Sequence, residues 1–227
     1  MAQTSPDLRK LNPASKEYLE AVYELEEEGQ RILQARIGER LGLAPATVSE
    51  GIKRLVNEGY VTVRSTRDIV LTEGGRLLAQ TLVRRHRLAE RMLTDILGIP
   101  WHLCHAQAED WEKVMTSEVE EAILQKLDGE PTCPHGNPIP GTSSAIPWSD
   151  LQPVSRLRMG QSACLVRLLE DVELDHDVLK YLEDHSLMPG RLLTLVDVGP
   201  DGTLTLEVEE RRVALGPRLA GNLWVLI

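Results

Sequence analysis

The most restrictive feature of this sequence is a change of apolar pattern across a proline-rich segment, residues 128–153. Before it, apolar side chains recur at helical spacing, as Leu19, Val22 and Leu25 do. After it, short runs rich in Leu and Val alternate with tight turns such as 199–202, a pattern typical of a small β-barrel. The sequence therefore predicts a mainly α chain that ends in a small β module.

The helical part begins with three predicted helices at 15–28, 36–41 and 45–57, with Ser15 as the expected cap of the first. Two short β-prone runs, 60–63 and 68–71, follow and predict a hairpin. Two longer helices are expected over 72–98 and 101–127. This order predicts a winged helix-turn-helix domain at 1–73, a helical domain at 74–128, a proline-rich linker at 129–153 and a small β-barrel at 154–227.

Composition excludes several classes of protein. No apolar run approaches the roughly 20 residues that a membrane helix needs, and the polar start lacks a secretory apolar region. The three cysteines are too few and too scattered for a disulfide framework, and no Cys-x-x-Cys pair offers a zinc site. We therefore expect a cytoplasmic protein without a membrane partner.

Charge is distributed unevenly along the chain. The net charge is −10, yet residues 31–91 carry 12 Lys or Arg against six Asp or Glu. A basic segment in an acidic chain is a candidate contact surface for phosphates, although a solvated helical surface has the same composition.

The third predicted helix and the hairpin carry the candidate DNA contacts. With Val48, Ile52 and Leu55 buried, small and polar side chains face outward at the start of the helix, as in a recognition helix. Basic side chains further along are suited to phosphates, which position a protein without specifying sequence. The predicted contacts to double-stranded DNA are Ala46, Thr47, Ser49, Glu50, Lys53, Arg54, Arg64 and Arg67.

Three helices carry His and carboxylate groups at spacings that share a helix face. His86 and Glu90 are four residues apart, Glu17 and Glu20 are three apart, and His105, Glu109 and Glu112 follow each other at helical spacing. Helical bundles build metal sites from such groups, and a divalent cation relieves the repulsion between clustered carboxylates. Each pair alone is also compatible with a solvated surface pair.

Several of these stretches occur together in a known family. The sequence resembles the diphtheria toxin repressor family of metal-dependent regulators over nearly its whole length, including an SH3-like C-terminal module. The stretches that carry the resemblance are 18–19, 23–29, 35–49, 85–91, 111–115 and 136–141. The resemblance implies a transcriptional repressor, not an enzyme and with no small-molecule substrate, that binds palindromic operator DNA as a homodimer when loaded with Mn(II) or Fe(II).

The resemblance also implies that the helical domain at 74–128 binds metal and mediates dimerisation, that the domain at 154–227 is SH3-like, and that the chain has two metal sites. Its primary site transfers to Glu17, Glu109 and Glu112, with Glu20 as a further carboxylate of the manganese-sensing branch. Its ancillary site transfers to His86, Glu90 and His105, and two ligands from the SH3-like module are expected at Glu173 and His176, with Asp175 as a rival to His176. We expect Cys104 to be a core residue, Cys133 and Cys164 to be structural or incidental, and His135 and His185 to be surface groups.

The sequence departs from the family pattern at the primary site. Glu17 and Glu109 stand where the iron-sensing pattern has sulfur ligands, and hard oxygen ligands suit Mn(II). Lys113 stands where the family has a histidine, and a protonated lysine cannot bind a cation. Glu20, His102, a backbone carbonyl or water then completes the site, or the ancillary site dominates.

Three rival functions follow from these residues. One is a winged-helix protein whose metal response is weakened or lost. Another is an interaction protein whose SH3-like barrel is the main functional surface. The third is a metallohydrolase, which the sequence disfavours because it lacks His-Glu-x-x-His, Gly-x-Ser-x-Gly and phosphate-loop motifs.

Overall fold

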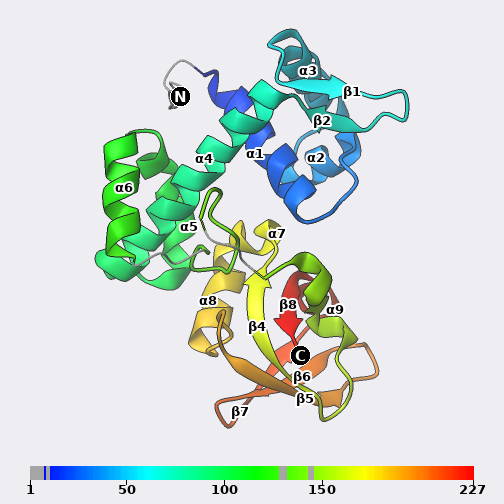
Figure 1. Ribbon diagram of the computed structural model, residues 1–227. Coiled ribbons are helices and arrows are strands. Elements are labelled where there is room, and N and C mark those ends of the chain that lie inside the picture. The colour runs from blue at the N-terminus through cyan, green and yellow to red at the C-terminus, as the bar shows by residue number, and fades with distance from the viewer. Residues whose placement is uncertain (1–7, 9–10, 128–131, 143–145) are drawn as a thin grey trace. The chain divides into compact units, whose positions relative to one another are not determined.

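A computed structural model of the chain describes residues 8, 11–127, 132–142 and 146–227 (Figure 1). These residues form two compact units, of which the first lies within 1–86 and 110–120 and the second within 87–109 and 121–227. The division passes through three helices, after His86 in the long helix that begins at Glu73, and after Glu109 and Glu120 in the two helices that follow it. Among the described residues, no helix is both long and apolar enough to cross a membrane.

The first unit begins with three helices, α1 (Pro13–Glu27), α2 (Gln34–Leu41) and α3 (Pro45–Asn57). Asn12 rather than Ser15 caps α1, because its side chain accepts a hydrogen bond from the Ala14 amide at 3.0 Å. The buried Ser15 hydroxyl instead donates to Glu58 at 2.9 Å. Gly42 ends α2 in the left-handed conformation, with φ of 63°, which permits the short turn into α3.

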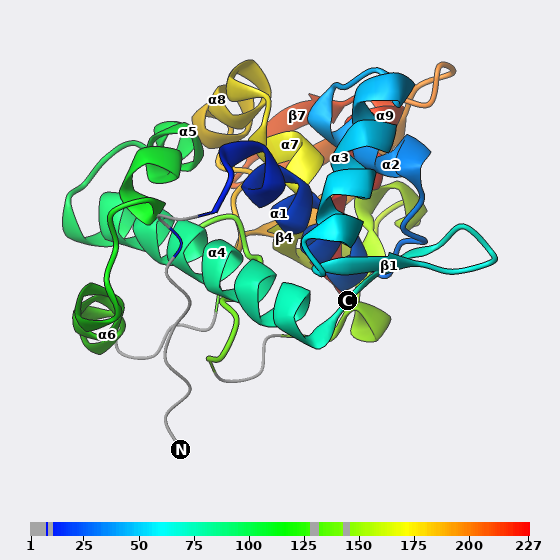
Figure 2. The ribbon, with the colours of Figure 1, turned by 90° about the horizontal axis from the view of Figure 1, so that it is seen from above.

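A hairpin completes the winged helix. Strands β1 (Val61–Val63) and β2 (Ile69–Leu71) pair antiparallel, with Val61 opposite Leu71. In Figures 1 and 2 the turn between them projects away from the three helices. The hydrophobic core beneath is made by apolar residues of α1 to α3, both strands and the start of the next helix.

The long helix α4 (Glu73–Arg91) continues into a π-helical segment, Met92–Ile96. The predicted single helix over 101–127 is wrong, because the structure has α5 (Trp101–Glu112) and α6 (Ser117–Lys126) there. The chain turns at 113–116, where Met115 is buried and the Thr116 hydroxyl accepts from the Val119 amide at 3.5 Å. A threonine that caps a new helix competes with continuation of the preceding one.

The C-terminal part of the second unit is an antiparallel six-stranded sheet with strand order β3-β8-β4-β5-β6-β7. The strands are β3 (Gln152–Pro153), β4 (Ser162–Leu168), β5 (Leu192–Val198), β6 (Leu204–Val208), β7 (Arg211–Leu215) and β8 (Leu223–Leu226). Short helices α7 (Glu170–Glu173), α8 (His176–Asp184) and α9 (Pro217–Asn222) connect them, and short 3-10 segments cover Trp148–Asp150 and Val154–Arg156. The core of this small β module consists mainly of Leu and Val.

Candidate metal centre

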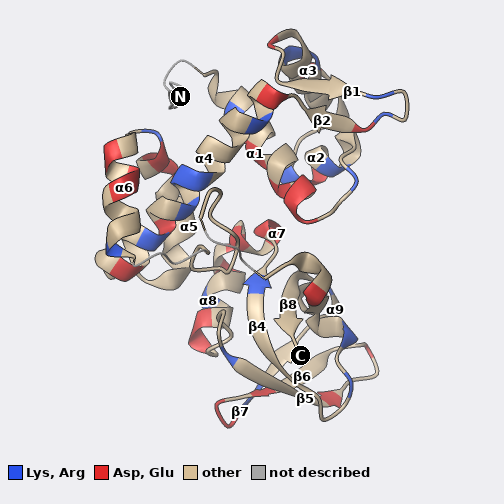
Figure 3. Cartoon of the chain, in the orientation of Figure 1, with Lys and Arg blue, Asp and Glu red and all other residues tan. Residues whose placement is uncertain are grey.

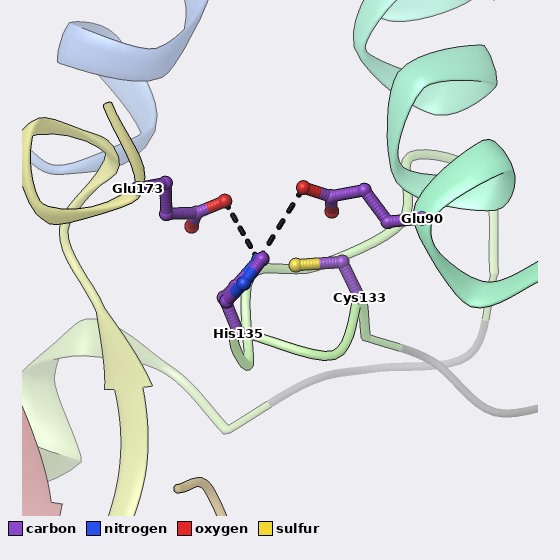
Figure 4. A group of neighbouring side chains, drawn as sticks. All are labelled: Glu90, Cys133, His135 and Glu173. Atoms are coloured by element: carbon purple, nitrogen blue, oxygen red, sulfur yellow. Dashed lines mark ion pairs between the residues drawn. The ribbon is translucent and has the colours of Figure 1, made fainter. Parts of the chain in front are cut away.

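Four potential metal ligands meet inside the second unit. Glu90 of α4, Cys133 and His135 of the 132–142 loop, and Glu173 of α7 are all buried, and one ligand atom from each lies within 4.8 Å of the others (Figure 4). Nδ1 of His135 lies 2.9 Å from Glu173 Oε2 and 3.3 Å from Glu90 Oε1. We call these four residues the buried centre.

The loop that carries Cys133 and His135 is held against the end of β4. The Leu168 amide donates to the His135 carbonyl at 3.0 Å, and the Asn137 side chain donates to the Leu168 carbonyl at 3.0 Å. Gly136 has a φ of 92°, and an added Cβ there would lie 2.0 Å from the Val166 carbonyl oxygen. Only glycine permits this approach, which directs His135 inward.

The expectation that His135 is a surface group is therefore wrong, since it is 0% exposed. Helical spacing does not identify His135 as a ligand, because the residue lies in a loop and not on a helix. The pair Cys133 and His135 is two residues apart, and its members converge only because the loop folds onto β4. The sequence feature that could have indicated this site is the Cys-x-His pair of Cys133 and His135, which Gly136 follows.

Opposite charges stabilise one another in the buried centre. Burial by itself lowers the pKa of His135, but the carboxylates of Glu173 and Glu90 raise it, and the net pKa lies well above the usual value. Burial acts to raise the pKa of Glu173, yet the charge of His135 leaves it below its usual value. Burial raises the pKa of the Cys133 thiol far above its ordinary value. The group is thus an imidazolium held between carboxylates.

His105 of α5 contacts the same two carboxylates. Its Nδ1 lies 3.0 Å from Glu90 Oε1 and 3.3 Å from Glu173 Oε2. Of the residues expected at the ancillary site, the structure thus brings together Glu90, His105 and Glu173. His176 is exposed, and its ring centroid lies 5.1 Å from that of His102, whose ring pairs with Glu183.

A second acidic group lies within the first unit. Nδ1 of His86 contacts Glu112 Oε2 at 2.9 Å. Burial raises the pKa of Glu20 well above its usual value, the charge of Glu112 raises it further, and His86 lowers it. Of the residues expected at the primary site, Glu20 and Glu112 therefore interact, and His86 joins them. Glu17 and Glu109 are exposed, and Lys113 pairs with Asp110 at 3.0 Å. That Glu17 and Glu109 bind metal stays a prediction.

The residues of the buried centre fit a divalent cation. In the first unit, Glu20 Oε1 is buried and has no hydrogen-bond partner among the described residues. Buried charges are retained in proteins when they are paired or bind metals. Two carboxylates, an imidazole and a sulfur suit a transition metal, whereas the oxygen-rich group of Glu20 and Glu112 with one imidazole suits Mn(II) or Fe(II).

The face expected to read DNA is accessible. Ala46, Thr47, Glu50 and Lys53 of α3 are exposed, and Ser49 and Arg54 are partly exposed. Tyr18 of α1 donates its hydroxyl proton to the Thr47 carbonyl at 3.1 Å, which fixes the start of α3. Arg64 and Arg67 are exposed on the turn of the hairpin, and Figure 3 shows basic residues on α3 and on this turn.

Comparison with protein families gives three matches in succession. Residues 10–69 match "Iron dependent repressor, N-terminal DNA binding domain", and residues 72–141 match "Iron dependent repressor, metal binding and dimerisation domain". Residues 152–226 match the FeoA domain.

Whole-chain comparisons agree with these matches. The iron-dependent repressor IdeR of Mycobacterium tuberculosis is 38% identical over 210 residues, which cover 88% of this chain and 91% of the relative. The diphtheria toxin repressor of Corynebacterium diphtheriae is 36% identical and covers 94% of this chain and 96% of the relative. A solved manganese-dependent transcriptional repressor in complex with manganese superimposes with a TM-score of 0.79, at 27% identity, over 93% of this chain and 99% of that chain.

Proposed function

This chain belongs to the iron-dependent repressor family, and we propose that it represses transcription as a homodimer that binds a palindromic operator when loaded with Mn(II) or Fe(II). As a member of that family it is a metal-dependent DNA-binding regulator and not an enzyme. The observation that carries the proposal is the coexistence of an exposed recognition helix with carboxylate and imidazole groups gathered in both units.

Two sets of residues would hold the cations. In the second unit they are Glu90, Cys133, His135 and Glu173, with His105 beside them. In the first unit they are Glu20, His86 and Glu112, and the resemblance adds Glu17 and Glu109. A bound divalent cation supplies positive charge that neutralises these carboxylates.

Metal binding by these residues favours DNA binding because it orders the helices of the DNA-binding domain. Glu20 lies on α1, which packs against α2 and α3, and Glu112 lies at the end of α5. Uncompensated carboxylates on separate helices repel one another, so the winged helix-turn-helix domain is held less rigidly when no metal is bound. Once these helices are held together, DNA binding costs less ordering entropy.

The test is operator affinity at one fixed salt concentration, because phosphate contacts make affinity depend on salt. Wild type is compared with chelator, with Mn(II) and with Fe(II). We expect Glu112→Gln and Glu173→Gln each to weaken the metal response, and the control Glu207→Gln, at an exposed position, to retain it. Glu109→Ala tests Glu109, an exposed residue that helical spacing and the resemblance both predict to be a ligand. If operator affinity is the same with chelator and with either ion, metal does not control DNA binding. The result would then favour a winged-helix protein whose metal response is weakened or lost, the rival function that Lys113 suggests.

A further inference from the structure

We propose that Cys104 is a positioning residue for the buried centre, because its sulfur accepts the Nε2 proton of His135 and so directs Nδ1 toward the cation. The proposal rests on the function proposed above and assigns a role to a side chain that the sequence presents only as core. Cys104 lies on α5 and is 0% exposed.

The two nitrogens of His135 face different groups. Nδ1 faces Glu173 Oε2 at 2.9 Å and Glu90 Oε1 at 3.3 Å, whereas Nε2 lies 3.9 Å from Cys104 Sγ. Each nitrogen therefore has its own environment: carboxylates on one side and a thiol on the other. The carboxylate side is where the remaining ligands of the buried centre gather (Figure 4).

An imidazole that binds a metal through one nitrogen carries its proton on the other. That N–H requires an acceptor, and the acceptor fixes which nitrogen is free to bind. For His135, the Sγ of Cys104 accepts from Nε2–H, and Nδ1 is left to bind. Because the ring is fully buried, an Nε2–H without an acceptor would carry the cost of an unsatisfied polar group.

The same helix fixes the loop around His135. The ring of Trp101 on α5 lies with its centroid 4.6 Å from that of His135, and its Nε1–H donates to the Pro134 carbonyl at 3.0 Å. Trp101 therefore restrains the position of the ring, while Cys104 selects its protonation pattern. Cys104 is not in any group of potential ligands among the described residues, whereas Cys133 is.

The test uses the full chain loaded with Co(II), whose charge-transfer absorption reports sulfur that is bonded to the metal. The first-unit group of Glu20, His86 and Glu112 contains no sulfur, so the band reports the buried centre. We expect Cys104→Ala to weaken Co(II) affinity about 10- to 100-fold, the usual effect of losing such a partner, with the band retained. Cys104→Ser, which keeps an acceptor, should restore most of the affinity. Cys133→Ala should abolish the band.

Two further measurements test whether the effect is specific to Cys104 and to the protonation of His135. Cys164→Ala, at a cysteine outside the buried centre, should leave affinity unchanged. In zinc-loaded protein, ¹⁵N NMR should show His135 protonated at Nε2 and metal-bound at Nδ1, and this pattern should be lost in Cys104→Ala.

Unchanged affinity and an unchanged His135 spectrum in Cys104→Ala would overturn the proposal. Loss of the sulfur band in that variant would also overturn it, because Cys104 would then be a ligand. A wild-type chain that shows no sulfur band at all would refute the buried centre itself, and is thus distinguishable from failure of the positioning role alone.

Discussion

At the scale of single residues, His135 links metal binding to pH. Its folded pKa is raised, so in the metal-free protein it contributes stability that is present below the ordinary histidine pKa of about 6.5 and is lost as the pH rises through the folded value. Metal binding at Nδ1 has the opposite dependence, because a proton on Nδ1 must leave first.

We therefore expect the melting temperature of the metal-free protein to fall as the pH is raised above about 6.5, and the increase produced by Mn(II) to become larger. Differential scanning calorimetry with and without Mn(II) measures both. Glu20, whose pKa is also raised, acts in the same direction at lower pH. His135→Gln should flatten the dependence at the higher pH values; a curve identical to wild type would exclude His135 as its source.

Substitutions of single residues also distinguish contacts to phosphate, which position the protein on DNA, from contacts to bases, which specify the sequence. Arg64 and Lys53 are exposed cations suited to phosphate. Arg64→Gln should weaken binding to specific and random DNA alike and reduce the slope of log affinity against log salt by about one. Lys180→Gln is the matched control, since Lys180 pairs with Asp184 at 2.9 Å on α8 and belongs to the second unit. Equal effects of the two substitutions would argue against a phosphate contact at Arg64.

At the scale of elements, α3 packs closely on α1 through a glycine. A Cβ at Gly51 would lie 2.3 Å from the Tyr18 ring, whose hydroxyl donates to Thr47. This contact sets how the start of the recognition helix is presented. Substitution of Gly51 must therefore displace Tyr18, α3 or both.

We expect Gly51→Ala to lower the free energy of unfolding by about 1–3 kcal/mol, the usual cost of overpacking, and to weaken DNA binding. Gly74→Ala is the control, because a Cβ added to Gly74 would meet no described atom within 4 Å other than its neighbours and the backbone of α4 itself, and alanine favours a helix. Urea titration measures both variants. Equal stability of Gly51→Ala and wild type would show that the α1–α3 contact is loose.

At the scale of the whole molecule, metal and DNA binding are thermodynamically linked. If Mn(II) tightens operator binding by a given factor, the operator must tighten Mn(II) binding by the same factor. Calorimetric titration of Mn(II) into free and operator-bound protein checks this equality, and Glu173→Gln should reduce both factors together. Coupling in one direction only would contradict a shared equilibrium.

The sequence by itself determined the mainly α architecture with a small β module, because helical and strand periodicities are local properties of the chain. It also determined the winged helix and the carboxylate and imidazole pairs on α4 and α5, since helical spacing brings residues four apart to one face. The resemblance of short stretches was sufficient for the family, which the comparisons confirm.

Only the tertiary structure decided which of these groups meet. His135 and Cys133 reach Glu90 and Glu173 because hydrogen bonds to β4 fold their loop inward, and no local pattern encodes a contact between segments so far apart in sequence. The exposure of His176 and the break between α5 and α6 have the same origin. Side chains of distant segments converge only when those segments pack together. That packing depends on the complete fold and not on a local sequence pattern.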